Sequence, residues 1–230
     1  MSALMNTPAF GILLSAAAFE IGIIISRKTK NPLMNPLLTA IVLVILVLMG
    51  LDIPKEKYDL GGRFILFFLG PATVVLAVPL YKQMELLKKD FVPIIAGILA
   101  GSVTSILSVI LLSKLFQVDL SVAVSMLPKS VTTAIGMEIS REIGGIVSLS
   151  VAVIVLTGIT GAVMGPALLK LFRIRDHVAQ GVAMGTASHA VGTSKAMELG
   201  ETQGAMSGLS IGIAGIATVI LVPILMGLLG

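Results

Sequence analysis

The stretch Leu127-Pro128-Lys129-Ser130-Val131-Thr132-Thr133 interrupts an apolar segment of this chain with a proline, a charge and three hydroxyls. A second apolar segment is interrupted by Gly185-Thr186-Ala187-Ser188-His189-Ala190-Val191-Gly192-Thr193. Proline removes a backbone donor and clashes with the preceding turn, while serine and threonine can cap a helix that restarts. We therefore predict that both segments break near their middles.

The two interruptions belong to a repeat. A shift of sixty positions gives nine identities over the 29 positions from Val122 to Ser150, among them Thr133 with Thr193 and Glu138 with Glu198. Each copy holds an interrupted apolar segment followed by an uninterrupted one, a pattern that in transporters marks the binding site. Broken backbone at membrane depth is tolerated only where it is buried in protein or lines a wet cavity.

The composition is that of a membrane protein. Hydrophobic residues make up 56% of the 230 residues and charged residues only 12%, against about 25% charged in soluble domains. Apolar runs long enough to span a bilayer lie near residues 8–26, 33–51, 64–81, 91–113, 146–172 and 204–229. We expect an all-α polytopic membrane protein with about six transmembrane helices and two re-entrant or broken hairpins in an inverted repeat.

Charge counting favours hairpins over eight complete spans. If both broken segments turn back and the amino terminus is outside, nine lysines and arginines lie on the cytoplasmic side and five outside. If both cross, the count is seven on each side. The nine are Arg27, Lys28, Lys30, Lys82, Lys88, Lys89, Lys170, Arg173 and Arg175, and the five are Lys55, Lys57, Arg63, Lys114 and Arg141. Eight spans remain the alternative.

The whole chain, 1–230, is expected to form one membrane domain. Residues 1–115 would supply scaffold helices, 119–172 the first repeat copy and 179–229 the second. Pro71 and Pro79 are expected to kink the third span.

Several functions are disfavoured by what the sequence lacks. The formal charge of +4 sits in short clusters beside apolar runs, which fits membrane topology and not nucleic-acid binding. No cysteine is present, and the two histidines form no His-Glu-x-x-His motif. We expect no enzyme activity, no catalytic residues, no metal and no cofactor.

The two interruptions resemble those of the LrgB/CidB family of bacterial membrane proteins, which carry a Pro-Lys-Ser-Val-Thr-Thr stretch and a Gly-Thr-Ala-Ser-His-Ala-x-Gly-Thr stretch. Similarity extends to Asn31-Pro32, Asn35 to Leu38, Gly70 to Thr73, Val78 to Tyr81 and Glu198 to Gly200, and so covers nearly the whole chain. In that family a proline often follows the threonine pair, whereas Ala134 follows it here.

The resemblance implies two functions. Plastid relatives transport glycolate and glycerate, and some bacterial pairs are linked to pyruvate, so we expect a proton-coupled secondary transporter of small monocarboxylates of the glycolate, glycerate, lactate or pyruvate type. The alternative is an antiholin-like regulatory protein that controls murein hydrolase export and cell lysis. Either protein would be a multi-pass, homo-oligomeric protein of the bacterial inner membrane that works with a small LrgA/CidA-like partner.

Hydroxyls at the breaks are candidate substrate ligands, because the start of a helix offers free amide hydrogens and partial positive charge to a carboxylate. The candidates are Ser130, Thr132, Thr133, Thr186, Ser188 and Thr193. The simpler interpretation is that these residues only cap the restarting helices. Gly185 and Gly192 are expected to permit the turn and close backbone approach.

Ionisable residues near the breaks are the other candidates. Lys129 could attract the substrate carboxylate, or it could form an ion pair with Glu138, Glu198 or Glu20. His189, opposite Lys129 in the repeat, could carry a coupling proton or only hydrogen-bond between hairpins. Glu138 and Glu198 are further proton-coupling candidates. We expect substitution of Lys129 or Thr133 to depress transport more than expression.

Overall fold

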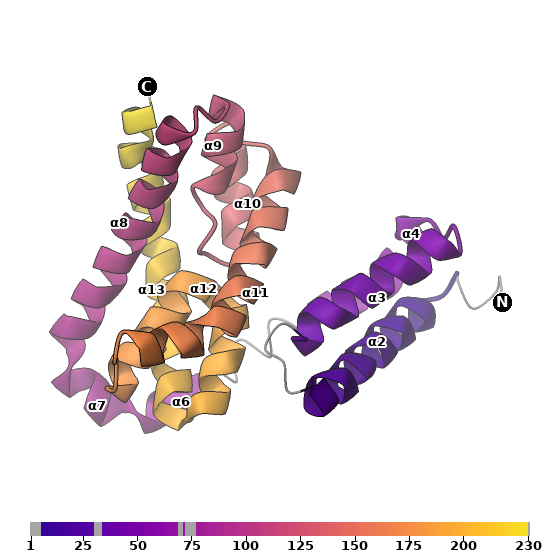
Figure 1. Cartoon of the computed structure of the whole chain (residues 1–230), viewed down its shortest axis with the longest axis horizontal. Helices are drawn as coiled ribbons and strands as arrows, with labels where there is room; N and C mark the ends of the chain where they lie inside the picture. The colour runs from indigo at the N-terminus through magenta and orange to yellow at the C-terminus, as the bar shows by residue number, and fades with distance from the viewer. Residues whose placement is uncertain (1–5, 30–33, 69–70, 72–76, 230) are drawn as a thin grey trace. The chain divides into compact units, whose positions relative to one another are not determined.

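The computed structural model describes residues 6–29, 34–68, 71 and 77–229. These described residues form helices and no strands, as expected for an all-α protein (Figure 1). Packing divides the chain into two compact units, Met1–Val75 and Leu76–Gly230.

The first unit is a small helical assembly. It contains α2 (Pro8–Thr29), α3 (Pro36–Gly50) and α4 (Lys55–Phe67). Gly11 on α2 faces Gly61 on α4 so closely that a Cβ at either position would overlap backbone atoms of the other helix. Beside this contact, the Ser15 Oγ and the Tyr58 hydroxyl hydrogen-bond at 2.8 Å.

The second unit holds both interrupted segments. It contains α6 (Ala77–Lys82), α7 (Met84–Lys89), α8 (Phe91–Leu115), α9 (Leu120–Met126), α10 (Thr133–Glu142), α11 (Val147–Leu171), α12 (His177–Leu199), α13 (Glu201–Met226) and η1 (Gly227–Leu229). One apolar cluster of its core lies where α8 packs against α12 and α13, around the buried side chains of Ile94, Ile98 and Met206. Another joins α8, the connector after α9, α10 and α13, and includes Ile106, Leu127, Val131, Ile139 and Val222. The expected scaffold of residues 1–115 is therefore divided, since α8 packs with the repeat region.

The described residues contain four helices long and apolar enough to cross a membrane: Pro8–Thr29, Phe91–Leu115, Val147–Leu171 and Glu201–Leu229. They correspond to four of the six expected spans. The expected span at 33–51 is a helix of 15 residues, which at about 1.5 Å per residue is shorter than a bilayer core of about 30 Å. The expected span at 64–81, with its kink between Pro71 and Pro79, includes residues 69–70 and 72–76, which lie outside the described residues.

The first interrupted segment breaks as predicted. Helix α9 ends at Met126 and α10 begins at Thr133, and the chain reverses direction in between. The reversal brings Ser125 of α9 and Ser140 of α10 to one residue of α11, because Ser150 Oγ donates to Ser125 O and bonds Ser140 Oγ, both at 2.7 Å. At the start of α9, hydrogen bonds from the side chain and the backbone N–H of Ser121 lower the pKa of the Asp119 cap.

The second interrupted segment also breaks near its middle. Within α12, His189 has φ 44° and ψ −140°, a left-handed conformation that non-glycine residues rarely adopt. The two halves of α12 then lie on the same helix, α13. Gln180, near the start of α12, accepts a 3.1 Å hydrogen bond from Gln203, while Thr193 in the second half bonds Ser207 at 2.7 Å.

Close backbone approach of α12 to α13 depends on Gly185. A Cβ at this position would overlap the carbonyl oxygen of Ser207. The role expected for Gly185 in close approach is therefore confirmed, although the residue with non-helical backbone is His189.

Candidate functional site

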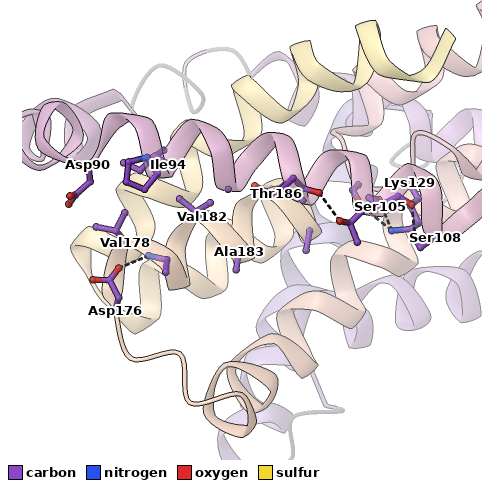
Figure 2. Close-up of a pocket in the computed structure, with 18 residues that line it drawn as sticks. Asp90, Ile94, Ser105, Ser108, Lys129, Asp176, Val178, Val182, Ala183 and Thr186 are labelled. Atoms are coloured by element: carbon purple, nitrogen blue, oxygen red, sulfur yellow. Dashed lines mark hydrogen bonds between the residues drawn. The ribbon is translucent and has the colours of Figure 1, made fainter. Parts of the chain in front are cut away.

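A cavity of about 760 Å³ lies in the second unit, between α8, the connector of residues 127–132 and the first half of α12 (Figure 2). Small residues of α8 and α12 face it and leave room beside the polar groups. Its lining includes Asp90, Ile94, Gly97, Gly101, Thr104, Ser105, Ser108, Lys129, Ser130, Asp176, Val182, Ala183, Thr186 and Ala187.

Lys129 lies at one end of the cavity and is half-buried. Its ammonium donates hydrogen bonds to Ser105 Oγ at 2.9 Å and to Ser130 Oγ at 3.1 Å, and these two hydroxyls bond each other at 2.9 Å. Lys129 lies in the connector that follows the end of α9, and its side chain reaches Ser105 of α8 from there. The ammonium thus has neutral partners that leave its charge uncompensated.

The alternatives in which Lys129 forms an ion pair with Glu138 or Glu198 are wrong, because both glutamates have other partners. Glu138 pairs with Arg141 and Glu198 with Lys195, and each pair is exposed. No ion pair of Lys129 with either glutamate occurs among the described residues of the second unit. Glu20 belongs to the first unit, and its pairing with Lys129 stays a prediction. Both pairs form within one helix, because side chains three positions apart lie next to each other on the helix surface.

Thr186 faces the same cavity from α12 (Figure 2). The residue is only 5% exposed, and its Oγ1 has no hydrogen-bond partner within the described residues. A buried hydroxyl without a partner costs free energy, about 1–3 kcal/mol on mutational scales. A ligand in the cavity is the available partner for this group.

Negative charge gathers at the opposite end of the cavity. Figure 2 shows Asp90 and Asp176 at the end away from Lys129, Ser105 and Ser108. Asp176 is exposed and caps α12 by accepting a 2.8 Å hydrogen bond from the Ala179 N–H. The cavity therefore has an acidic mouth and a basic, hydroxyl-rich inner end.

Four of the predicted site residues line a cavity: Lys129, Ser130 and Thr186 line the large one, and Ser188 lines a smaller neighbouring one with Lys129. The other four, Thr132, Thr133, His189 and Thr193, line neither cavity.

Thr133 is the first residue of α10, and the other three residues have the following positions and hydrogen bonds. Thr132 is the residue before α10 and its side chain makes no capping bond, so the predicted cap at this position is wrong. Thr193 Oγ1 bonds His189 O at 3.0 Å as well as Ser207. His189 is buried, and its Nε2 lies 2.9 Å from Ile154 O of α11.

Hydroxyls of α8 were not among the predicted site residues. Thr104, Ser105 and Ser108 line the cavity, and Ser105 and Ser108 lie about one helical turn apart on the face toward Lys129 (Figure 2). A cluster of hydroxyls inside an otherwise apolar span of 25 residues is the signal that could have identified them. No group of three or more histidines, acids or cysteines that could hold a metal ion occurs in the described ranges.

Comparisons with known proteins agree over almost the full length. The LrgB-like family matches residues 15–228. The chain is 38% identical over 225 residues to "Antiholin-like protein LrgB" of Bacillus cereus (strain B4264), covering 97% of this chain and 98% of the relative. The protein of that name from Bacillus anthracis (strain A0248) has the same identity and coverage. No solved structure matches. The names of both relatives agree with the antiholin-like alternative, and neither mentions transport.

Proposed function

Because this chain belongs to the LrgB-like family of multi-pass membrane proteins, we propose that it carries small monocarboxylates across the bacterial inner membrane. One observation carries the proposal: the Lys129 ammonium faces a cavity, has no carboxylate partner among the described residues of the second unit, and lies close to hydroxyls that could bind the same substrate. An ionisable group at membrane depth is costly and is therefore a functional hypothesis by default.

The chemistry of the cavity suits one carboxylate. Lys129 supplies the positive charge, Ser105 and Ser130 hold its ammonium in place, and Thr186 offers an unused hydroxyl. The volume of about 760 Å³ falls in the usual range for ligand sites and leaves space for water around a glycolate or pyruvate ion. A second carboxylate would find no cation and would lie closer to Asp90 and Asp176, so we expect monocarboxylates to be preferred over dicarboxylates.

Purified protein in liposomes tests the transport function. Uptake of labelled glycolate, lactate, pyruvate and glycerate would be measured with and without an LrgA/CidA-like partner and with and without a pH gradient. Saturable uptake of at least one acid supports the proposal. Absence of uptake under all four conditions, with protein that is folded and inserted, contradicts it.

An antiholin-like role is the second candidate, and the relatives' names favour it over transport. In this case the protein, with its LrgA/CidA-like partner and as a homo-oligomer, would control murein hydrolase export and cell lysis without carrying a substrate. Cells that lack the protein would be complemented with the wild type and with Lys129→Met. Restored control of lysis by Lys129→Met, when this variant no longer takes up carboxylates, would favour the regulatory role.

For the membrane topology we propose six spans and two hairpins that enter from opposite faces and form an inverted repeat. The reversals between α9 and α10 and within α12 support hairpins, because each brings both halves of a broken segment to one neighbouring helix. Eight complete spans are the alternative. Neither a cofactor nor an enzymatic step is part of the proposal.

Cysteine labelling is expected to place the two hairpin mouths on opposite faces of the membrane. The chain has no native cysteine, so single substitutions need no background removal. Glu142→Cys should react with an impermeant reagent from outside, and Arg175→Cys and Glu201→Cys from the cytoplasm. Glu142 is preferred to Gly144, whose φ of +77° disfavours any side chain. Cytoplasmic labelling at Glu142→Cys would favour eight spans.

We propose that His189 carries the coupling proton, with Glu138 and Glu198 as the next candidates. We expect His189→Gln to keep exchange at equal pH but to lose the acceleration given by a pH gradient. Glutamine can replace the hydrogen bond to Ile154 O, but it cannot change charge near neutral pH as histidine does. Full gradient-driven uptake by His189→Gln would leave His189 as a structural bridge to α11.

A further inference from the structure

A second, smaller cavity adjoins the first at Lys129. Its volume is about 360 Å³, and its polar lining consists of Lys129, Ser188 and two threonines of α11, Thr157 and Thr160. Lys129 and Ala187 line both cavities. These two residues therefore stand where one cavity meets the other.

The first half of α12 presents one hydroxyl to each cavity. Thr186 and Ser188 are two positions apart, which on a helix of 3.6 residues per turn is about 200°, so their side chains point to opposite sides. Thr186 lines the larger cavity and Ser188 the smaller one. Ser188 is 1% exposed, and no hydrogen bond from its Oγ is found within the described residues. Each cavity thus has a buried hydroxyl available for a ligand.

Helix α11 comes close to the break of α12 because of Gly161. A Cβ at this position would overlap the Ser188 side chain. This contact places the second cavity beside the middle of α11, between Val153 and Gly161. The first cavity instead extends from Lys129 toward the starts of α8 and α12, where Asp90 and Asp176 lie (Figure 2).

We propose that Thr157, Thr160 and Ser188 form a second carboxylate subsite in the smaller cavity. The substrate reaches this subsite from the larger cavity by passing Ala187 while it stays bound to Lys129. The inference rests on the proposed transport function. The lysine ammonium is a point charge on a flexible four-carbon stem, so it can stay with the carboxylate while the hydroxyl partners change. Before the substrate moves, Lys129, Ser105 and Thr186 bind the carboxylate. After it has moved, Lys129, Ser188 and Thr157 bind it. No bond is made or broken, and the positive charge stays on Lys129.

Single cysteines on the two sides of Ala187 test the proposal. Ala183→Cys lies in the first cavity and Leu156→Cys in the second, neither residue is a proposed ligand, and both parent side chains are exposed. In liposomes with sorted orientation, a negatively charged methanethiosulfonate should modify Ala183→Cys only from the face where Arg175→Cys reacts, and Leu156→Cys only from the opposite face. Glycolate should slow both reactions at least fivefold. Ile220→Cys on α13, exposed and outside both cavities, is the control that glycolate should not protect.

The double variant Thr157→Val with Thr160→Val supplies a second readout, since valine keeps the shape of threonine and removes the hydroxyl. We expect kcat/KM for glycolate uptake to fall about tenfold with unchanged thermal stability. Labelling of both cysteines from one face, or wild-type kcat/KM in the double variant, would overturn the second subsite. Wild-type protein that takes up no carboxylate would instead overturn the transport function itself.

Discussion

Replacement of Lys129 by methionine is expected to lower glycolate uptake tenfold or more while the protein stays folded. The ammonium supplies the cation among the residues that line the larger cavity. Hydrogen bonds to a charged group contribute about 1.5–3 kcal/mol, and about 1.4 kcal/mol is a factor of ten in affinity. Methionine keeps a flexible apolar stem of similar length. Initial uptake rates at several glycolate concentrations would measure the loss.

Lys129→Met should lower glycolate uptake without lowering the thermal stability of the protein. No acid among the described residues of the second unit pairs with Lys129, so its removal leaves no carboxylate of this unit without a partner and removes the cost of a half-buried charge. A thermal unfolding midpoint equal to or above that of the wild type is expected. Lys129→Arg, which keeps the charge with a different shape, should retain part of the uptake.

Lys195→Met is the matched control for Lys129→Met. Lys195 lies in the second half of α12, pairs with the exposed Glu198 and lines neither cavity. Its replacement should leave uptake unchanged, since exposed pairs contribute little. Wild-type affinity for glycolate in a folded Lys129→Met protein would remove the carboxylate-binding role from this residue.

Replacement of Gly185 by valine is expected to prevent correct packing of α12 on α13. Even a single Cβ at this position would overlap Ser207 O and lie 2.8 Å from the Ser207 Cα. These are backbone atoms, which cannot turn away as a side chain could. Extra groups in a packed interior cost about 1–3 kcal/mol, and valine adds three carbons. We expect a lower unfolding midpoint and a smaller yield of monodisperse protein in detergent.

Gly208→Ala is the control for this packing prediction. A Cβ at Gly208 meets nothing within 4 Å, although the residue lies on α13, one position beyond Ser207. Alanine is better than glycine inside a helix by about 1 kcal/mol, so this variant should be as stable as the wild type or more stable. Gly185→Val with wild-type yield and unfolding midpoint would contradict the close approach of α12 and α13.

Much of the architecture could be predicted because it depends on local chemistry. Pro128 lacks the backbone N–H that a helix needs, and the polar residues after it favour a break between α9 and α10. Proline alone is not sufficient, since Pro166 and Pro223 lie inside the continuous helices α11 and α13. Long apolar runs likewise indicate spans wherever they occur, and four of the six expected spans have helices of sufficient length. The break in α12 could be located to a glycine-rich segment, but the distortion at His189 could not, since nothing in that residue's own chemistry requires a positive φ.

The sequence by itself determined that this is a helical membrane protein with two polar breaks, and it identified Lys129, Ser130, Thr186 and Ser188 as candidate ligands. Only the tertiary structure decided which hydroxyls face a cavity. Thr133 and Thr193 match in the repeat, yet neither lines a cavity, while Ser105 outside the repeat bonds Lys129. The reason is that proline and glycine act on their own backbone, whereas the direction of a side chain relative to a site depends on which helix packs beside it.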